Sequence, residues 1–536
     1  MRGPLSHLIV VLALLAAPAA AQSAAKPCAS CHADIVASYS KTVMAHASAP
    51  ALQDLVTGDF IHKPSGVHFR VYSEGGKAWM RYDRPGDDIV RGKRELLYSI
   101  GSGVKGKTYL FSEKGFLFET PINWYSQSNT WNMAPAYTEA RQIPMTLPAL
   151  TDCLNCHTSG LKAPEPGTEN LYKGKPFADG GITCERCHGP GDAHSRDGKA
   201  PIVNPAKLSA DRRDAVCMLC HFEGTVAIQQ RGRNLYDFEP GENLADYIHY
   251  FLVNDETSEK PRALSQFEAL SMSQCKIKSG DKMSCTTCHN PHSEPPAAEK
   301  IDYYRSKCLS CHGEPFAAKH HPKQPDCTSC HMPQLPTAAV AHTETTDHRI
   351  LKRPNTLQFT TIPTVPKLTP FPKSVEATVR DSALAWQTLA QREVKGASEN
   401  AERYLKQALA AESDDPVLLN SAAYIAQEHG KYDQARQLYE RALKLDPLST
   451  DAVTNLGVLE AREGRLSRAV QLWQQAFQRA PYRSAIGMNL AMAFCSTGQA
   501  KEARAYVVQV LDFNPDLPNA KRLLHSLNAD PPTCNP

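Results

Sequence analysis

The stretch that decides the fold is Cys285-Thr-Thr-Cys288-His289-Asn-Pro-His292, because its first five residues recur along more than half of the chain. The spacing Cys-x-x-Cys-His occurs seven times, far more often than 17 Cys and 20 His among 536 residues would give by chance. The copies contain, in order, Cys28, Cys31 and His32; Cys153, Cys156 and His157; Cys184, Cys187 and His188; Cys217, Cys220 and His221; Cys285, Cys288 and His289; Cys308, Cys311 and His312; and Cys327, Cys330 and His331.

The spacing has a chemical reason. Two thiols three positions apart can add to the two vinyl groups on one edge of a haem, and the adjoining His then supplies the proximal ligand of the iron. Zinc sites do not require a His after every Cys pair. Thioredoxin-like pairs occur once or twice in a domain, and 14 free thiols in an exported chain would form disulfides. The sequence therefore predicts seven c-type haems, with the 14 motif Cys as attachment points and the seven motif His as proximal ligands.

A second set of His could fill the opposite face of each iron. Without the motif His, His7 and the C-terminal His429 and His525, ten His remain. We expect His194 and His292 to bind the irons of neighbouring haems, because neither can readily reach the far face of its own haem. The other candidates are His46 (with Met44 as an alternative), one of His320 and His321, one of His342 and His348, and also His62 and His249, whereas His68 is expected to be structural.

The density of motifs constrains the fold. Six motifs lie between Cys153 and His331, which leaves about 30 residues of chain for each haem. Such short segments cannot enclose each haem separately, so the haems are expected to touch one another among short helices and loops. The predicted fold class is mainly α, with a β-rich insert and a C-terminal helical solenoid.

The first residues predict export. Met1-Arg2 is followed by an unbroken apolar run over 8–17 and by Ala19-Ala20-Ala21, the layout of a signal peptide cleaved before Gln22. The run is half as long as a membrane helix, so the mature chain is expected to be periplasmic or otherwise exported, without a membrane span. Lys+Arg 59 against Asp+Glu 56 gives a net charge of +3, which argues against a nucleic-acid partner.

Three pieces of sequence carry a family resemblance: 184–194 (Cys-Glu-Arg-Cys-His-Gly-Pro-Gly, then His194), 285–292, and 326–333 (Asp-Cys-Thr-Ser-Cys-His-Met-Pro). With these pieces, residues 26–350 resemble the multihaem cytochromes c of the cytochrome c554 group. The resemblance implies that additional His such as His194 and His292 are distal ligands of neighbouring haems. Seven motifs differ from the four of the smaller members and the eight of the related octahaem oxidoreductases. No Cys-x-x-Cys-Lys is present, so the lysine-ligated catalytic haem of nitrite reductases has no counterpart.

The chain divides into a signal peptide (1–21), a seven-haem domain (22–350) with a β-rich insert (about 55–145), a Pro-rich linker (351–375), a repeat domain (376–525) and a tail (526–536). Alternating residues and Gly turns predict insert strands over 67–72, 78–82, 95–100, 107–111 and 116–120. The insert is expected to cover haem faces and pack a small sheet; the alternative is that it forms a substrate pocket or docking face.

A 34-residue period marks the repeat domain. It relates Gly430, Gly464 and Gly498, then Ala435, Ala469 and Ala503, and then Pro447, Pro481 and Pro515, with a weaker first copy at Ala401 and Ala408. This pattern is similar to the tetratricopeptide repeat, with Tyr439 and Trp473 at the bulky position of the second helix. Such repeats usually present a concave surface to a peptide or protein; the alternative is a stabilising or dimerising appendage. Three Cys lie outside the motifs: the sequence allows a Cys495–Cys534 disulfide, which leaves Cys275 as a buried thiol or an intermolecular partner.

These observations favour an exported carrier that passes electrons along seven haems, with repeats that dock a redox partner. No catalytic residue is assigned. The alternative is a multihaem oxidoreductase with one open-coordination haem that acts on a small nitrogen or sulfur compound, and a third reading is a scaffold with structural haems. Two His on every iron would favour electron transfer, whereas catalysis at iron needs a vacant position.

Overall fold

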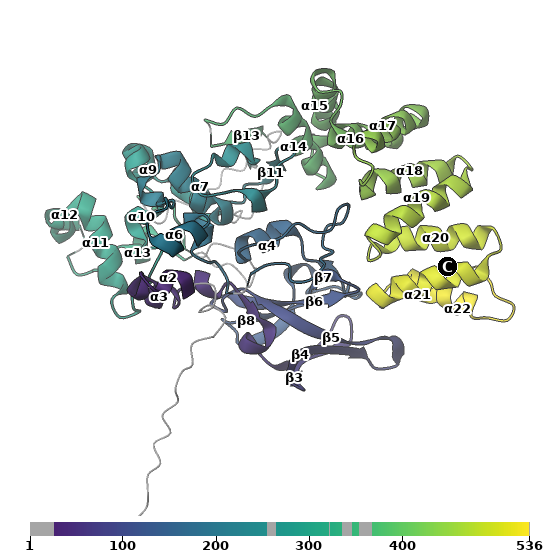
Figure 1. Cartoon of the computed structure of the whole chain (residues 1–536), viewed down its shortest axis with the longest axis horizontal. Coiled ribbons are helices and arrows are strands. Elements are labelled where there is room, and N and C mark those ends of the chain that lie inside the picture. Colours follow the sequence, from purple (N-terminus) through teal and green to yellow (C-terminus); the bar gives the residue numbers. More distant parts are fainter. Residues whose placement is uncertain are drawn as a thin grey trace, which may run out of the picture.

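The structure is a computed structural model, and it describes residues 26–178, 180–254, 264–320, 322–334, 346–352, 367–372 and 374–534. The expected signal peptide, His321 and His342 lie outside these residues. Of these described residues, 47% are helical and 17% are in strands. In Figure 1 the short motif-bearing helices lie on the left, the large sheet below the centre, and the helical repeats on the right.

The motif-bearing half is built from short helices. They are α2 (Lys26–Ala29), α3 (Ala33–Tyr39), α4 (Thr151–His157), α5 (Glu185–His188), α6 (Asp192–Asp197), α7 (Ala210–His221), α8 (Gln266–Met272), α9 (Gln274–Ser279), α10 (Cys285–Cys288), α11 (Lys300–His312), α12 (Glu314–His320) and α13 (Thr328–His331). Single 3-10 turns span Met44–His46, Ala51–Asp54, Pro135–Tyr137, Pro205–Lys207, Leu235–Asp237, Leu244–Asp246 and Gly280–Lys282. Among the described helices, none is both long and apolar enough to cross a membrane.

The insert between the first two motifs is an antiparallel sheet of ten strands. The strands are β1 (Ser48–Pro50), β2 (Gly58–His62), β3 (Val67–Glu74), β4 (Lys77–Arg84), β5 (Asp87–Ile100), β6 (Gly106–Glu113), β7 (Phe116–Glu119), β8 (Ile122–Tyr125), β9 (Thr130–Met133) and β10 (Leu147–Pro148). Their order is β10-β7-β6-β5-β4-β3-β2, with β1 on β5 and β8 between β6 and β9. All five strands expected from the sequence are present. In β3, the alternate residues Val67, Phe69 and Val71 are buried in the core of the sheet.

A second, three-stranded sheet joins the two halves of the molecule. It pairs β11 (Val226–Gln229), β12 (Ile248–Asn254) and β13 (Lys367–Phe371), all antiparallel. β13 lies within the segment expected to be a Pro-rich linker. Pro370 is compatible with the strand because β13 is an edge strand, where a missing N–H costs no ladder hydrogen bond.

The C-terminal part is a stack of paired antiparallel helices, as the 34-residue period predicts. They are α14 (Val379–Gln391), α15 (Ala397–Ala411), α16 (Pro416–Glu428), α17 (Tyr432–Leu445), α18 (Thr450–Arg462), α19 (Leu466–Arg479), α20 (Ser484–Ser496), α21 (Ala500–Phe513) and α22 (Pro518–Leu527). Gly430, Gly464 and Gly498 take φ of +74°, +79° and +74° at the turn inside each pair, a conformation that glycine adopts without strain. The repeating Ala435, Ala469 and Ala503 are fully buried between helices.

The repeats contact the motif-bearing half at both of their ends. At one end Phe116 and Phe118 of the large sheet pack against Tyr482 and Phe513, with ring centroids 5.4–6.5 Å apart. At the other end α14 covers β11 and β12 through a shared apolar core. The repeat stack therefore forms an arch along one side of the molecule, attached at both ends, as Figure 1 shows.

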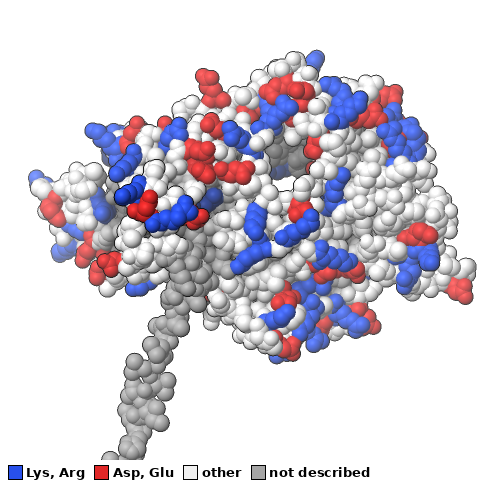
Figure 2. Space-filling model, in the orientation of Figure 1, with Lys and Arg blue, Asp and Glu red and all other residues white. Residues whose placement is uncertain are grey.

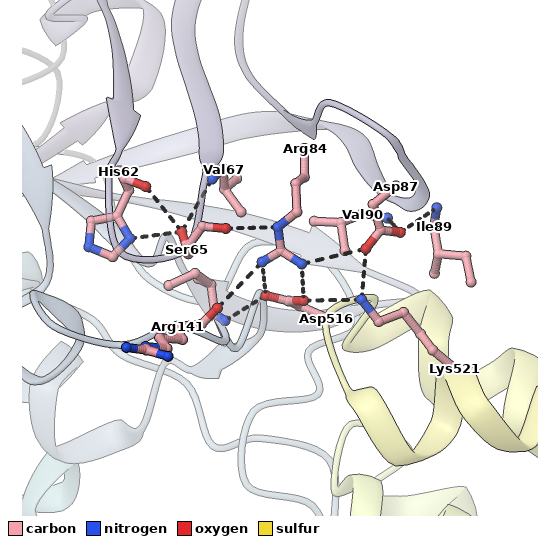
Figure 3. A network of polar contacts seen from close by, with 11 residues as sticks. His62, Ser65, Val67, Arg84, Asp87, Ile89, Val90, Arg141, Asp516 and Lys521 are labelled. Carbon is pink, nitrogen blue, oxygen red and sulfur yellow. Dashed lines mark hydrogen bonds and ion pairs between the residues drawn. The ribbon is translucent and has the colours of Figure 1, made fainter. Parts of the chain in front are cut away.

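Charged contacts reinforce the arch where the repeats reach the large sheet. Arg84 of β4 donates two hydrogen bonds of 2.6 Å to the carboxylate of Asp516, whose side chain is 2% exposed. Lys521 bridges Asp516 and Asp87 at the same place (Figure 3). On the face shown in Figure 2, acidic and basic side chains are interspersed over both halves, in keeping with the small net charge.

Candidate haem sites

Each motif forms one turn of helix. The amide of the motif His donates to the carbonyl of the first motif Cys at 2.9–3.0 Å in the motifs that begin at Cys28, Cys184, Cys285 and Cys327. Residues at i, i+3 and i+4 lie on one side of such a turn, so the two thiols and the imidazole face the same way. This is the arrangement that attachment of one porphyrin edge and ligation of its iron require.

Four motif His lie opposite a His from outside the motifs. His32 pairs with His194, with ring centroids 6.5 Å apart and planes 10° apart, and His188 pairs with His292 at 5.9 Å and 9°. In the same way His289 lies 6.2 Å from His348, with planes 30° apart, and His331 lies 5.8 Å from His320, with planes 28° apart. Each pair joins residues from different motif segments.

These separations fit an iron between the two rings. A histidine nitrogen lies about 2 Å from the metal it binds, and the ring centre about 1.2 Å farther back, so trans imidazole centroids lie about 6.4 Å apart. Ordinary aromatic contacts span the same range. However, each of the four pairs joins one motif His to one His outside the motifs, which is the combination that axial ligation needs.

The ring nitrogens are oriented for ligation. A backbone carbonyl can only accept, so an Nδ1 atom that contacts one must carry the proton, which leaves the lone pair of Nε2 for a metal. Four of the paired His have such a contact, at 2.6–2.9 Å: His188 with Val203, His194 with Ala200, His331 with Leu351 and His348 with Thr346. In addition burial, and then the neighbouring His188, lower the pKa of His292, which favours the neutral, ligating form.

The thiols of different motifs meet. Side-chain contacts join Cys28 to Cys184, Cys156 to Cys220, Cys217 to Cys285, and Cys308 to Cys327. Cys187 and Cys220 also interact, as do Cys288 and Cys311, so that all seven motifs form one connected group. Burial and these sulfur neighbours raise the pKa of Cys184 and of Cys308 to about 11, so these groups are thiols at neutral pH.

A buried polar contact locks two motifs together. Arg186, in the variable position of the third motif, donates to the carbonyl of Asn155 at 3.1 Å and also to its side chain, in the variable position of the second motif. Asn155 is 2% exposed. The variable residues of these motifs thus fix how neighbouring motifs pack.

Three further candidate distal His have other polar contacts, and no ring contact with a motif His is found for them in the described part of the chain. Nδ1 of His62 contacts Ser65 Oγ at 2.8 Å (Figure 3). Its Nε2 contacts the carbonyl of Thr138 at 2.9 Å, so both ring nitrogens are engaged within the sheet region. Nε2 of His46 contacts the carbonyl of Ser40 at 2.8 Å.

His249 points toward the repeats. Its Nδ1 contacts Asp381 of α14 at 2.8 Å. Side chains alternate along β12, and it is Ile248 and Tyr250 that pack against α7, the helix of the fourth motif. His249 is therefore a contact between the two halves of the molecule. His68, expected to be structural, contacts Asp59 at 2.7 Å on the solvent side of the large sheet.

In the described residues, no group of three or more His, Cys, Asp or Glu side chains is arranged to hold a metal ion. No disulfide joins the motif Cys there, whereas Cys495 and Cys534 form the disulfide that the sequence allows. Sequence reasoning missed the partner of each distal His, because a pairing between distant segments leaves no signal in local spacing.

Motifs, short helices and facing His define a class, the multihaem c-type cytochromes, here joined to a helical repeat domain. Comparison with known proteins agrees. The family model "Cytochrome c554 and c-prime" matches residues 123–189, and two tetratricopeptide repeat models match 420–485 and 460–527. The chain is thus a multihaem cytochrome c that resembles the cytochrome c554 group and carries C-terminal tetratricopeptide repeats.

Two curated relatives each match part of the chain. The multiheme cytochrome MtrA of Shewanella baltica (strain OS185) is 25% identical over 179 residues, which are 30% of this chain and 52% of the relative. A TPR repeat-containing protein of Treponema pallidum (strain Nichols) is 33% identical over 82 residues, 15% of this chain and 34% of the relative. The chain thus spans about half of the first relative's length and a third of the second's.

Solved structures match about a quarter of the chain. A crystal structure of MamA is 17% identical, covers 25% of this chain and 78% of its own, and has a TM-score of 0.23. MamA 41-end from Desulfovibrio magneticus RS-1 is 22% identical, covers 28% of this chain and 86% of its own, and has a TM-score of 0.25.

Proposed function

We propose that this chain is an exported electron carrier in which 14 Cys attach seven c-type haems and the repeat domain docks a protein partner. The single observation that carries the proposal is the set of four facing His pairs, spaced for one iron each. When bound, haem iron supplies one-electron chemistry, and two His ligands keep it six-coordinate in both oxidation states.

The interactions between motif thiols also support a spatial order for the proposed haems. Thiol contacts join the first motif to the third, the fourth to the fifth, and the sixth to the seventh. Electrostatic interactions between thiols connect the third motif to the fourth and the fifth to the sixth. The second motif joins this row at the fourth, through Cys156 and Cys220. The facing His connect the same motifs. His194 follows the third motif and faces the first, and His292 follows the fifth motif and faces the third.

Export rests on the sequence of residues 1–21 and on the chemistry of the motifs. Thioether attachment consumes the thiols, which otherwise would form disulfides in an oxidising compartment. The disulfide between Cys495 and Cys534 belongs to the same kind of compartment. We expect the mature protein to begin near Gln22 and to fractionate with periplasmic or secreted proteins.

The decisive experiment counts the haems. A pyridine haemochrome assay on the purified full-length protein, normalised to protein by amino-acid analysis, should return seven covalent haems per chain. A colourless protein, zinc in the metal analysis, or a count clearly below seven would overturn the proposal. Proteins captured by the full-length chain but not by one with a substituted repeat surface would identify the docking partner.

A further inference from the structure

Two buried hydrogen-bond donors belong to a pair of side chains that contact each other between the second and third motifs. They are Nε of Arg186 and Nδ2 of Asn155, and within the described residues neither atom has a hydrogen-bond partner. Other atoms hold the two residues side by side, because Nη2 of Arg186 donates to the carbonyl of Asn155 at 3.1 Å and also to its Oδ1. Each side chain therefore keeps one buried donor for something else.

The charge of the pair favours an anion as the missing acceptor. The guanidinium of Arg186 remains protonated throughout the pH range in which proteins fold. Asn155 is neutral and 2% exposed, so its bonds with Arg186 bring no opposite charge to a site that solvent hardly reaches. Buried donors are normally satisfied and buried charges are normally paired. A carboxylate would do both, because it accepts several hydrogen bonds and forms strong ones with a guanidinium.

The pair lies where three motifs meet. Arg186 stands directly before Cys187 of the third motif, and Asn155 stands directly before Cys156 of the second. Arg186 also interacts electrostatically with Cys220, so the fourth motif is close as well. A haem carries two propionate side chains, and in a chain with a haem on each motif these are the carboxylates that such a junction would meet.

We infer that Arg186 and Asn155 together bind a propionate of a haem other than the two attached beside them. The inference rests on the proposed function, since it requires haems at the motifs. Thioether bonds and propionates are on opposite edges of a haem, and both residues lie between the Cys of a motif, at the thioether edge of its own haem. One carboxylate held from two motifs would fix a further haem relative to both.

Infrared difference spectra between the oxidised and reduced full-length holoprotein test the inference, with the propionate carboxylates isotopically labelled through labelled aminolevulinate. Arg186→Gln should shift one labelled carboxylate band, because the propionate loses its charged partner. Arg186→Lys, which keeps the charge and a donor, should restore most of the original band position. The matched control is Arg212→Gln, since Arg212 is exposed and donates to the carbonyl of Gly241. It should leave the labelled bands unchanged.

Asn155→Asp tests the site without removing Arg186. The new side chain has nearly the same shape, takes away the Nδ2 donor, and offers Arg186 a carboxylate from the protein itself. It should therefore displace the propionate and shift the same labelled band as Arg186→Gln. All four variants should retain seven haems in the pyridine assay, because no attachment Cys or iron ligand is changed.

The two proposals fail in different ways. Labelled bands that stay in place in both Arg186→Gln and Asn155→Asp would show that water or a free anion satisfies the donors, which overturns the inference alone. An equal shift in Arg212→Gln would also overturn it, since the effect would then follow the net charge and not the buried contact. Fewer than seven haems in the unsubstituted protein would instead overturn the proposed function.

Discussion

At the scale of single residues, a short backbone contact sets the direction of four of the paired imidazoles. His194 follows its motif by six residues, yet its Nδ1 contact with the carbonyl of Ala200 turns Nε2 toward His32 of another motif. The sequence predicts that His194 and His292 serve neighbouring haems. It cannot predict which ones, because the partner depends on how distant segments pack.

His292→Met tests this pairing. His292 faces His188, so the change should affect the haem of the third motif and leave the haem of its own motif unchanged. A His/Met iron has a higher potential than a bis-His iron, and a spectroelectrochemical titration should therefore show one of seven components shifted upward.

His68→Met is the matched control, because His68 contacts Asp59 on the solvent side of the large sheet. It should leave all components in place, and both variants should retain seven haems. A titration of His292→Met that superimposes on that of the unsubstituted protein would exclude His292 as a ligand.

At the scale of helices and strands, local patterns predict the repeats and the insert well. The 34-residue period predicts paired helices because Gly at φ near +75° and small buried residues must recur once per pair. β13 was not predicted, since Pro370 reads as a linker residue unless the strand is known to lie at an edge. A strand that completes a sheet with a partner more than a hundred residues earlier, as Lys367 does with Asn254, leaves no local signal.

The Cys495–Cys534 disulfide ties the tail to α20, across a sequence separation of 39. Closing a loop of this length restricts the unfolded chain, so Cys534→Ser should lower the stability of the last repeat by about 2–4 kcal/mol. Hydrogen exchange followed by mass spectrometry over α20 to α22 measures the change. Cys275→Ser, which removes a free thiol, is the control and should leave these helices unchanged.

At the scale of the whole molecule, the motif-bearing half and the repeat stack contact each other at two places. The residues that join them are unremarkable in sequence, since Arg84 and Asp516 are ordinary surface residue types until the fold buries their pair. Composition and periodicity describe each half separately. They contain no information about a contact between positions 432 residues apart.

Asp516→Asn should loosen the repeats from the large sheet. The change leaves Arg84 with only its longer contact to the carboxylate of Asp87, at 3.5 Å, in a partly buried site, which costs about 2–3 kcal/mol. The expected result is faster hydrogen exchange at α22 and in β4. Asp512→Asn, four residues away at the same interface, removes a half-exposed contact with Lys114 and should cost less than about 1 kcal/mol. Equal effects of the two variants would contradict the importance of the buried pair.

The opposite end of the arch should be sensitive to acid. Burial alone would raise the pKa of Asp381, but hydrogen bonds from His249, Thr378 and Gln230 outweigh it and lower the pKa to about 2. A carboxylate with a lowered pKa contributes stability above its unfolded value, near 3.8, and loses it as the pH falls toward 2. The α14 contact should thus weaken by about 2 kcal/mol between pH 4 and pH 2.

Hydrogen exchange of α14 at a series of pH values, corrected for intrinsic rates, measures this loss. In the Asp381→Asn variant, the α14 contact should be less stable at neutral pH. Its stability should then change little across the acid range. A variant that follows the same acid profile as the unsubstituted protein would assign the transition to other groups.

The arch has a mechanical consequence. A repeat solenoid that is attached at one end only can change its curvature freely when it binds a partner. A solenoid that is attached at both ends transmits a change of curvature to the elements that hold it. Here the supports are the large sheet, through Tyr482 and Phe513, and the three-stranded sheet, through α14. A partner that bends the solenoid therefore also displaces the two sheets beside the haem motifs, without contacting the motifs themselves.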